Sequence, residues 1–501
     1  MKRILKILGI VLIIMTITLA TTACDNGNGD SSGTQTKTYT VTFDADNGSE
    51  PTTQTVTEGG TAAKPANPAK NGYGFAYWFN TATDTEWDFN TPITANLSLK
   101  AKWNINQYTV TFDADNGSES TTQTVTEGST ANKPADPSKT YTPIGLYAGT
   151  PPTSYTFVEW QKSDGSAWNF TADTVTADIT LTAQWTVPTL IDLTDETGNN
   201  IVEKSVSYVN ANGGSEYTLV LGEDVSNVAP QTLDQDDTTL TITSDGNTER
   251  KISLGNNGIL FRVGGTTTDY ITYYPRSAKL VLDGHITLKG KIDNNASLVA
   301  VVSGGSLELK GNAKITGNVN DGIDSSDVDW STGIVTWGGS GTGEGVIITM
   351  SGNAEISDNS TPNTGNVFGG IMIGDYTTFT MNENAVIKNN SGWRGGGVHI
   401  AGNNGAVFIM NGGKISGNTV TSDGGGVYVN TGATFIMNGG EITDNTSDGD
   451  GGGVYNMGTF TVASEQVKAG IYDNIATRQF YIQVYTLTGG FTVGGEPANS
   501  F

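Results

Sequence analysis

Cysteine, histidine and basic residues are all scarce in this chain. One cysteine and two histidines occur among its 501 residues. A single cysteine excludes disulfides within the chain and any zinc site built from several cysteines, and two histidines exclude most histidine-based metal centres. Lysine and arginine number 26 against 51 aspartates and glutamates, which gives a net charge of −25. Because such a chain repels phosphate backbones, nucleic acid is not expected as a partner.

Apolar and charged residues are also few, at 36% and 15% of the chain. The aromatic content of 9% and the low charge density nevertheless argue against a disordered polyelectrolyte. Glycine is abundant instead, with 66 residues. Glycine together with many threonines and asparagines is typical of short strands joined by tight turns, so the composition predicts an all-β protein.

The first residues have the pattern of an export signal. Basic residues precede an apolar run from Ile7 to Ala20, which is shorter than the ~20 residues of a membrane-spanning helix but suits a signal peptide. The small residues that lead to Cys24 resemble the lipobox of bacterial lipoproteins, although Thr21 replaces the usual leucine. The resemblance implies a signal peptide over 1–23, lipidation of Cys24 and a flexible tether over 24–38. An ordinary secretory signal is the alternative.

A repeated unit follows the tether. The segment YTVTFDADNGSEPTTQTVTEGG starts at Tyr39 and recurs, nearly unchanged, from Tyr108. The second copy is longer, because it carries extra residues between Pro137 and Tyr155. Apolar residues alternate with threonines in both copies, which predicts strands, and the Asp-Asn-Gly sequence predicts a tight turn. A unit this small buries little surface, so its tryptophans are expected to supply much of the core.

The two units resemble the Listeria–Bacteroides repeat, also called the internalin-B-type repeat. In the first copy the family pattern is matched by Phe43, Asp44, Ala45, Glu58, Gly59, Pro65, Pro68, Gly72, Tyr73, Phe75, Trp78, Trp87, Phe89, Ala101 and Trp103. Asn47 stands where the family has glycine. The resemblance implies two β-grasp-like modules, over 39–103 and 108–185, of the kind that serves surface proteins as a spacer or an adhesive unit without catalysis.

A second, longer-range repeat begins beyond residue 258. Isoleucines recur, each followed three residues later by an asparagine, and the asparagines are Asn318, Asn359, Asn390, Asn418, Asn445 and Asn474. A second series at the same period consists of Leu309, Met350, Met381, Met410 and Met437. The glycine-rich segments GGIMI, GGGVHI, GGGVYV and GGGVYN form a third. A period of about 27–29 residues with three short strands predicts the stacked rungs of a right-handed parallel β-helix.

The repeat also predicts where its residues lie. The isoleucine and methionine series are expected to fill the interior, and the asparagines are expected to hydrogen-bond along a ladder in a turn. We place the β-helix over 190–501, with a helix from Ile201 to Tyr208 as its N-terminal cap. This half resembles the pectin-lyase-like β-helices of bacterial surface proteins. The predicted fold class is therefore all-β: two small β-grasp-like repeat modules followed by a right-handed parallel β-helix.

One insertion in the predicted β-helix, called the solenoid from here on, is rich in acidic and aromatic residues. It contains Asp321, Asp324, Asp327, Asp329, Trp330, Trp337 and Glu344. Acidic side chains suit calcium and tryptophans suit stacking on sugars, but the spacing matches no EF-hand, and a solvated surface loop is the alternative. Calcium is the one cofactor considered.

No catalytic residue and no metal ligand is predicted elsewhere. Arg394, beside Trp393, is interpreted as a surface arginine rather than a lyase-type base. His399 lies far in sequence from His285, so a histidine metal site is not expected.

These features together predict a non-catalytic, lipid-anchored protein of the bacterial cell envelope, at the outer membrane or cell surface. Its expected role is adhesion or binding of glycan or matrix. Its expected partners are the membrane, through the lipid anchor, and a host or matrix protein or a polysaccharide. Two alternatives stay open: a polysaccharide lyase or glycoside hydrolase on the β-helix, and a passive structural component of the surface.

Overall fold

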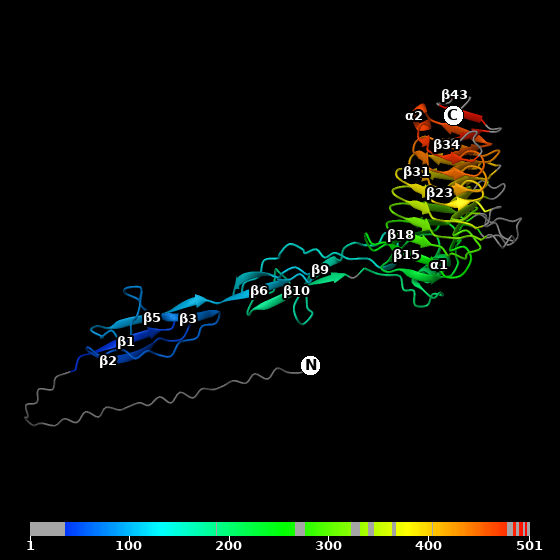
Figure 1. The fold of residues 1–501 in the computed structure, drawn as a ribbon. Coiled ribbons are helices and arrows are strands. Elements are labelled where there is room, and N and C mark those ends of the chain that lie inside the picture. Colours follow the sequence, from blue (N-terminus) through cyan, green and yellow to red (C-terminus); the bar gives the residue numbers. More distant parts are fainter. Residues whose placement is uncertain are drawn as a thin grey trace, which may run out of the picture. The chain divides into compact units, whose positions relative to one another are not determined.

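The computed structural model describes residues 36–186, 188–265, 276–321, 331–338, 345–362, 367–402, 404–477, 484–486, 490–493 and 496–497. The predicted signal peptide and Cys24 lie outside these residues. The chain forms two compact units, one with the first repeat and part of the second, the other with the rest of the second repeat and everything from Thr182 onward. Strands dominate both (Figure 1).

The first repeat is a mixed sheet. Its strands are β1 (Thr38–Asp44), β2 (Thr52–Thr57), β3 (Tyr73–Asn80), β4 (Thr85–Glu86) and β5 (Leu97–Ile105), in the order β2-β1-β5-β3-β4. The β1–β5 pair is parallel and the β1–β2 and β3–β5 pairs are antiparallel. Because side chains along β1 alternate between the two faces of the sheet, Val41 and Phe43 are both buried. The rings of Phe43 and Trp78 pack edge to face, with their centroids 5.3 Å apart. The tryptophan thus lies in the core, as expected.

The second repeat repeats this arrangement with one addition. Its sheet has the order β7-β6-β10-β9, from β6 (Gln107–Asp113), β7 (Thr121–Thr126), β9 (Thr156–Gln161) and β10 (Ile179–Thr186). The extra residues contain β8 (Gly145–Ala148), which pairs antiparallel with β11 (Glu216–Leu221) of the solenoid. Leu146 of β8 is buried in the solenoid core. The insertion therefore covers a sheet edge that would otherwise be open.

Truncating Leu146 tests whether this strand stabilises the solenoid. Leu146→Ala removes a fully buried side chain, so the free energy of unfolding should fall by about 2–4 kcal/mol. Val158→Ala, in the same repeat but with a side chain 56% exposed, is the control and should change it by less than about 0.5 kcal/mol. Denaturant unfolding of the full chain measures both, and equal losses would argue against a capping role for β8.

The helix expected at the start of the solenoid is present and longer than predicted. It is α1 (Ile201–Asn212), whose N-cap Asn200 accepts hydrogen bonds from the backbone N–H groups of Val202 and Glu203. The carboxylate of Glu203 in turn accepts from Nδ2 of Asn200 at 2.9 Å, so the first turn has a reciprocal cap, and it also accepts from the backbone N–H of Asn199. Valines on one face of α1 join the solenoid core, which makes the helix an end cap together with β8.

Four sheets run along the solenoid in the described residues, and Figure 1 shows their strands following one another in sequence order. Sheet one is β43-β42-β38-β34-β30-β26-β23-β20-β17-β14-β11-β8. Its strands beyond β8 and β11 are β14 (Thr239–Ser244), β17 (Lys279–Leu282), β20 (Ser306–Leu309), β23 (Val346–Met350), β26 (Thr377–Met381), β30 (Val407–Met410), β34 (Thr434–Met437), β38 (Thr459–Val462), β42 (Gly490–Val493) and β43 (Glu496–Pro497). Apart from β8–β11 and β42–β43 its pairs are parallel.

Sheets two and three are parallel throughout. Sheet two comprises β12 (Val225–Val228), β15 (Arg250–Leu254), β18 (Ile286–Lys289), β21 (Lys314–Thr316), β24 (Glu355–Ser357), β27 (Val386–Lys388), β31 (Lys414–Ser416), β35 (Glu441–Thr443) and β39 (Ile471–Tyr472). Sheet three comprises β13 (Gln231–Leu233), β16 (Phe261–Val263), β19 (Val299–Val302), β22 (Ile334–Trp337), β25 (Ile371–Ile373), β29 (Val398–Ile400), β33 (Val427–Val429), β37 (Val454–Asn456) and β41 (Val484–Thr486).

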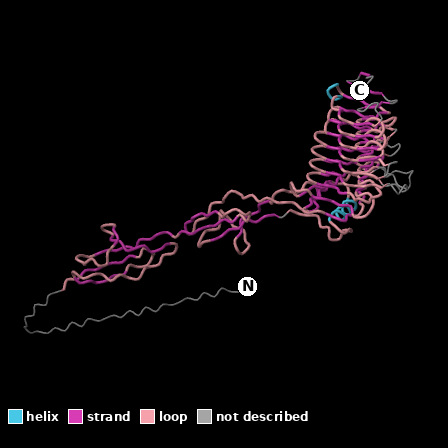
Figure 2. Tube along the Cα trace, viewed as in Figure 1, coloured by secondary structure: helices cyan, strands magenta, loops and turns pink. Residues whose placement is uncertain are grey.

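The later rungs add a fourth strand, which the repeat analysis did not predict. Sheet four consists of β28 (Ser391–Gly392), β32 (Thr419–Val420), β36 (Thr446–Ser447) and β40 (Ile475–Ala476). Loops and strands alternate around each turn in Figure 2, and a short helix, α2 (Glu465–Lys468), follows β38 near the C-terminal end.

The interior is filled as the periodic residues predict. The isoleucine and methionine series are buried, from Ile315 to Ile471 and from Leu309 to Met437. Sheet one adds a feature that the sequence interpretation missed, a column of stacked rings. Its members are Phe379, Phe408, Phe435 and Phe460, with ring centroids 4.7–4.8 Å apart. This spacing equals the distance between neighbouring rungs, so identical residues stack in register.

The buried asparagines form a continuous chain of hydrogen bonds. The side-chain Nδ2 of Asn418 donates to Oδ1 of Asn445 at 2.9 Å and to the carbonyl of Ile387 at 3.0 Å. Its Oδ1 accepts from the backbone N–H and the side chain of Asn390. The left-handed backbone conformation falls one residue earlier, for example at Asn389 with φ 55°. The turn thus places its strained residue beside the ladder rather than in it.

Candidate functional site

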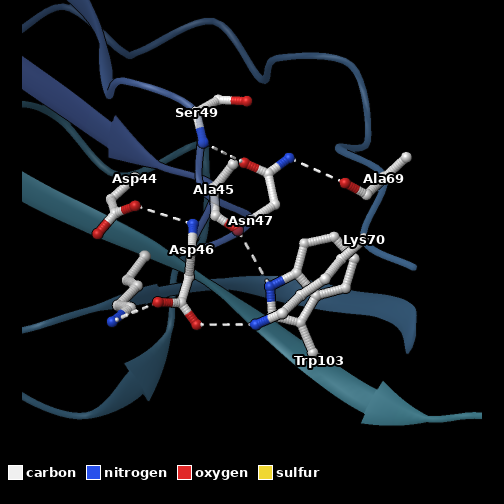
Figure 3. Close-up of polar contacts among 9 residues, drawn as sticks. Asp44, Ala45, Asp46, Asn47, Ser49, Ala69, Lys70 and Trp103 are labelled. Carbon is white, nitrogen blue, oxygen red and sulfur yellow. Dashed lines mark hydrogen bonds and ion pairs between the residues drawn. The ribbon is translucent and has the colours of Figure 1, made fainter. Parts of the chain in front are cut away.

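The Asp-Asn-Gly turn of the first repeat holds a cluster of polar contacts (Figure 3). Asp46 has φ 49° and its backbone N–H donates to Oδ1 of Asp44 at 2.8 Å. Its carboxylate lies 2.9 Å from Nζ of Lys100 and 3.2 Å from Nζ of Lys70. These hydrogen bonds, first from Lys100 and then from Lys70, lower the pKa of Asp46 below its ordinary value. Exposed ion pairs of this kind add little stability.

The hydrogen bonds of the Asn47 side chain account for an asparagine at a position where the family has glycine. Its Nδ2 donates to the carbonyl of Ala69 at 2.8 Å, and its Oδ1 accepts from the backbone N–H of Ser49. Beside it, the indole of Trp103 donates to the carbonyl of Ala45 at 3.0 Å, as Figure 3 shows. The polar groups of the turn are therefore hydrogen-bonded within the module.

The second repeat keeps the same contacts. Asn116 donates to the carbonyl of Ser138 at 2.8 Å, and Lys139 lies 2.9 Å from Asp115. Because the equivalent bonds recur in both copies and use the polar groups internally, this turn stabilises the fold of the module rather than forming a ligand site.

The acidic insertion is only partly described. Asp324, Asp327, Asp329, Trp330 and Glu344 lie outside the described residues. Asp321 follows the ladder turn, where its backbone N–H donates to the carbonyl of Asn294, and Trp337 ends β22. The described residues contain no group of three or more acidic, histidine or cysteine side chains arranged for a metal ion. Nε2 of His285 lies 2.9 Å from the side chain of Asn312 and takes part in a local polar pair.

A cavity of about 230 Å³ lies on the outside of sheet three. Its wall combines aromatic, apolar and polar side chains. It consists of Phe368, Met372, Trp393, Arg394, His399, Ala401, Tyr428 and Asn430. An aromatic wall with a few polar groups is the usual composition of a small-molecule site.

The three-residue strands of sheet three determine which side chains face this cavity. In β29, Val398 and Ile400 point into the solenoid, so His399 between them points outward. Met372 of β25 and Tyr428 of β33 are its partners in register. His399 stacks on Tyr428 with ring centroids 4.8 Å apart and on Phe368 at 3.7 Å. An outer aromatic stack thus runs along sheet three.

A glycine corner supplies the other wall. Trp393 and Arg394 lie between β28 and β29, before Gly395, which has φ 57°. A Cβ at Gly395 would lie 2.5 Å from the carbonyl oxygen of Val398, so the corner requires glycine. The guanidinium of Arg394 lies 4.1 Å from the centroid of the Trp393 ring and 5.2 Å from that of Tyr428. The structure therefore shows a packed cation–π arrangement, rather than the plain surface arginine predicted.

Charge and hydrogen bonding keep Arg394 in place. Its Nε donates to the hydroxyl of Ser422 at 3.4 Å and lies 3.8 Å from the carboxylate of Asp423, which is mostly buried. That carboxylate also accepts from the backbone N–H of Asp450 at 2.9 Å. The positive charge of Arg394 is thus balanced by the carboxylate of Asp423, which a hydrogen bond from the backbone of Asp450 positions.

His399 is neutral at physiological pH. Burial of the ring, with a smaller contribution from Arg394, lowers its pKa to about 3. Nδ1 is buried and has no hydrogen-bond partner among the described residues. A histidine with so low a pKa is a weak base and stays unprotonated near neutral pH, so it is poorly matched to proton transfer.

This burial predicts a pH dependence of stability. Between pH 6.5 and 3 the unfolded chain binds a proton on His399 that the folded chain does not, so stability falls as the pH drops through this window. From pH 7 to pH 5 the wild type should lose about 2 kcal/mol more of its free energy of unfolding than His399→Phe, which keeps the ring stack without the titration. Denaturant unfolding at both pH values measures the difference. Equal losses would show that His399 titrates normally.

The pocket was not predicted, although one signal for it is visible in the sequence. The second-last residues of the glycine-rich segments GGIMI, GGGVHI and GGGVYV are Met372, His399 and Tyr428, each between two β-branched residues that alternation directs into the interior. Trp393 comes from a separate corner, and no periodic feature connects it with these positions.

A family comparison identifies the repeats. The Listeria-Bacteroides repeat domain matches residues 39–102 and 108–184. These ranges agree with the two mixed sheets described above. The chain outside them is not covered by this match.

Curated relatives match over part of their length. A "Putative membrane protein" of Evansella cellulosilytica is 31% identical over 151 residues, 29% of this chain and 21% of the relative. A "Putative Gly-rich membrane protein" of the same organism is 32% identical over 185 residues, 36% and 18% of the two chains. Internalin H of Listeria monocytogenes is 35% identical over 150 residues, 29% and 24% of the two chains. The chain therefore spans less than a quarter of each of these relatives.

No solved structure matches this chain. In the described part of the chain, neither helix has the length and apolar character needed to cross a membrane. What the comparisons show is that this protein is similar to surface- and membrane-type proteins that carry internalin-type repeats.

Proposed function

We propose that this protein is a lipid-anchored, non-catalytic adhesion protein of the bacterial cell envelope, in which the solenoid binds a glycan or matrix component. The observation that carries the proposal is the aromatic pocket on sheet three, whose side chains suit binding. The repeats support it as well, because the family resemblance implies a spacer or adhesive unit, and Internalin H is 35% identical to this chain over 150 residues.

The pKa values of the ionisable side chains in the pocket support a binding role, since burial lowers the pKa of His399 and raises that of Tyr428, away from neutral pH in both cases. General acid–base catalysis works best when the pKa of the catalytic group lies near the working pH. The pKa of His399 is about 3, and an arginine stays protonated at any physiological pH. The pocket is therefore better suited to holding a ligand than to cleaving one.

The sequence around Cys24 supports the lipid anchor. Acyl chains bind a membrane with about 0.8 kcal/mol per buried CH₂ group, so two or three chains hold a protein firmly. Cells that express Cys24→Ala should incorporate no labelled fatty acid into the protein and should release it from the membrane fraction. A variant that keeps the label and the membrane association would exclude acylation at Cys24.

Retention on immobilised ligands tests the binding role. The full chain would be applied to a panel of polysaccharides and matrix proteins, with and without calcium, and the eluate assayed for oligosaccharides. Saturable retention without released sugar is expected. Released oligosaccharide would assign the protein to the lyases or hydrolases, and no retention on any member of the panel would favour a passive surface component.

A further inference from the structure

We propose that the pocket on sheet three binds a single uncharged pyranose ring of a glycan. This inference rests on the proposed adhesive function and adds to it the place of contact and the chemical class of the ligand. Size is the first argument. The cavity of about 230 Å³ is smaller than the ~300–1,000 Å³ of sites for drug-sized ligands, so it suits one ring rather than an oligosaccharide.

The walls suit the amphipathic faces of a sugar ring. The lining includes Trp393 and Phe368, whose ring centroids lie 6.0 Å apart, and Tyr428. Flat aromatic rings provide large apolar contact area with little loss of side-chain entropy, and the C–H faces of a pyranose offer a matching apolar surface. The ring stack on His399 holds Phe368 and Tyr428 in place before any ligand arrives.

Polar groups for the sugar hydroxyls stand at the rim. Arg394 is 31% exposed, and Ser422 is the one described residue that accepts a hydrogen bond from it, through Nε. Its two Nη groups therefore remain available as donors. Asn430, whose Nδ2 donates to the carbonyl of Ala401 at 3.2 Å, adds a fixed amide to the same wall. Directed donors next to an aromatic wall orient a ligand that carries hydroxyl groups.

Charge argues for an uncharged ligand. The guanidinium of Arg394 is already balanced by Asp423, so an anionic sugar would meet that carboxylate and the overall charge of −25. A cationic ligand would lie beside the guanidinium of Arg394, which already contacts the rings of Trp393 and Tyr428, and the two like charges would repel. A neutral ring needs no further counter-charge.

Saturation-transfer NMR with the full chain tests the site directly. The probes are the methyl β-pyranosides of glucose, galactose and N-acetylglucosamine, with methyl glucuronide as the anionic comparison. At least one neutral probe should bind and the glucuronide should bind more weakly. Trp393→Ala and Arg394→Gln should each weaken binding at least tenfold, whereas Trp393→Phe should retain it.

Tyr472→Ala is the matched control, because it removes an exposed tyrosine from β39 in sheet two and should leave binding unchanged. Circular dichroism establishes that each variant is folded. Binding that survives both Trp393→Ala and Arg394→Gln would overturn the proposed site, and preference for the glucuronide would overturn the ligand class. If none of the probes binds while the full chain is still retained on a matrix protein, the inference fails and the adhesive function stands.

Discussion

Replacing Ile442 with aspartate is expected to lower the free energy of unfolding of the solenoid by about 4 kcal/mol or more. Ile442 lies in β35 with no exposed surface, between Ile415 and Ile471 of the neighbouring rungs. A carboxylate there has no partner and no water, so the chain must bury an unpaired charge or open the rung. Chemical denaturation of the full chain, followed by far-ultraviolet circular dichroism, measures the loss.

Ile347→Asp is the matched control for this experiment. Ile347 is also an isoleucine within a solenoid strand, but its side chain is 54% exposed, whereas Val346 and Ile348 on either side of it are buried. Its replacement should change the free energy of unfolding by no more than about 0.5 kcal/mol. If both variants unfolded at the same denaturant concentration as the wild type, the assignment of the isoleucine column to the interior would be wrong.

Truncating one asparagine of the buried ladder should have the second largest effect. Asn418→Ala removes the acceptor of two hydrogen bonds from Asn390 and the donor of two others, to Ile387 and Asn445. The backbone N–H of Asn390 then stays buried without its acceptor, at a cost of about 1–3 kcal/mol for an unpaired group. Nδ2 of Asn390 keeps the carbonyl of Ile356 as its acceptor, and Oδ1 of Asn445 keeps the backbone N–H at position 418 as its donor. We expect a total loss of about 3–5 kcal/mol, which a shift of the denaturation midpoint would report.

An exposed asparagine ladder provides an internal comparison. Asn411 donates from Nδ2 to Oδ1 of Asn382 at 2.9 Å and accepts from Asn438 at 2.9 Å, so its contacts resemble those of Asn418. These groups are exposed, and water replaces a lost partner. Asn411→Ala should therefore cost less than about 1 kcal/mol. Equal costs for Asn411→Ala and Asn418→Ala would mean that burial does not determine the strength of the ladder.

The two ladders show that a recurring residue in the sequence does not by itself indicate whether the side chain is buried. Asn418 and Asn411 both recur at the rung period, and the sequence analysis singled out the first series, which follows the isoleucines by three residues. The column of Phe379, Phe408, Phe435 and Phe460 also recurs at this period, in TFTM, VFIM, TFIM and TFTV. The methionines of the same strands recur at the same period and predict the same buried face, so the phenylalanines add no separate periodic signal.

The all-β class, the two repeat modules and the interior of the solenoid follow from the amino-acid pattern alone. In a periodic chain, neighbouring rungs pair in register, so one repeat predicts the environment of every equivalent residue. Ile415 and Ile442 lie inside for the same reason.

The pairing of β8 with β11, and the presence of Trp393 and Tyr428 in the wall of one cavity, are visible only in the folded chain. The insertion that contains Leu146 has no equivalent in the first repeat, and it pairs with a strand about 70 residues away. Trp393 lies in the corner between β28 and β29, whereas Tyr428 lies in β33 of the following rung. Contacts of this kind depend on the path of the chain between the segments, and neither local propensity nor period records that path.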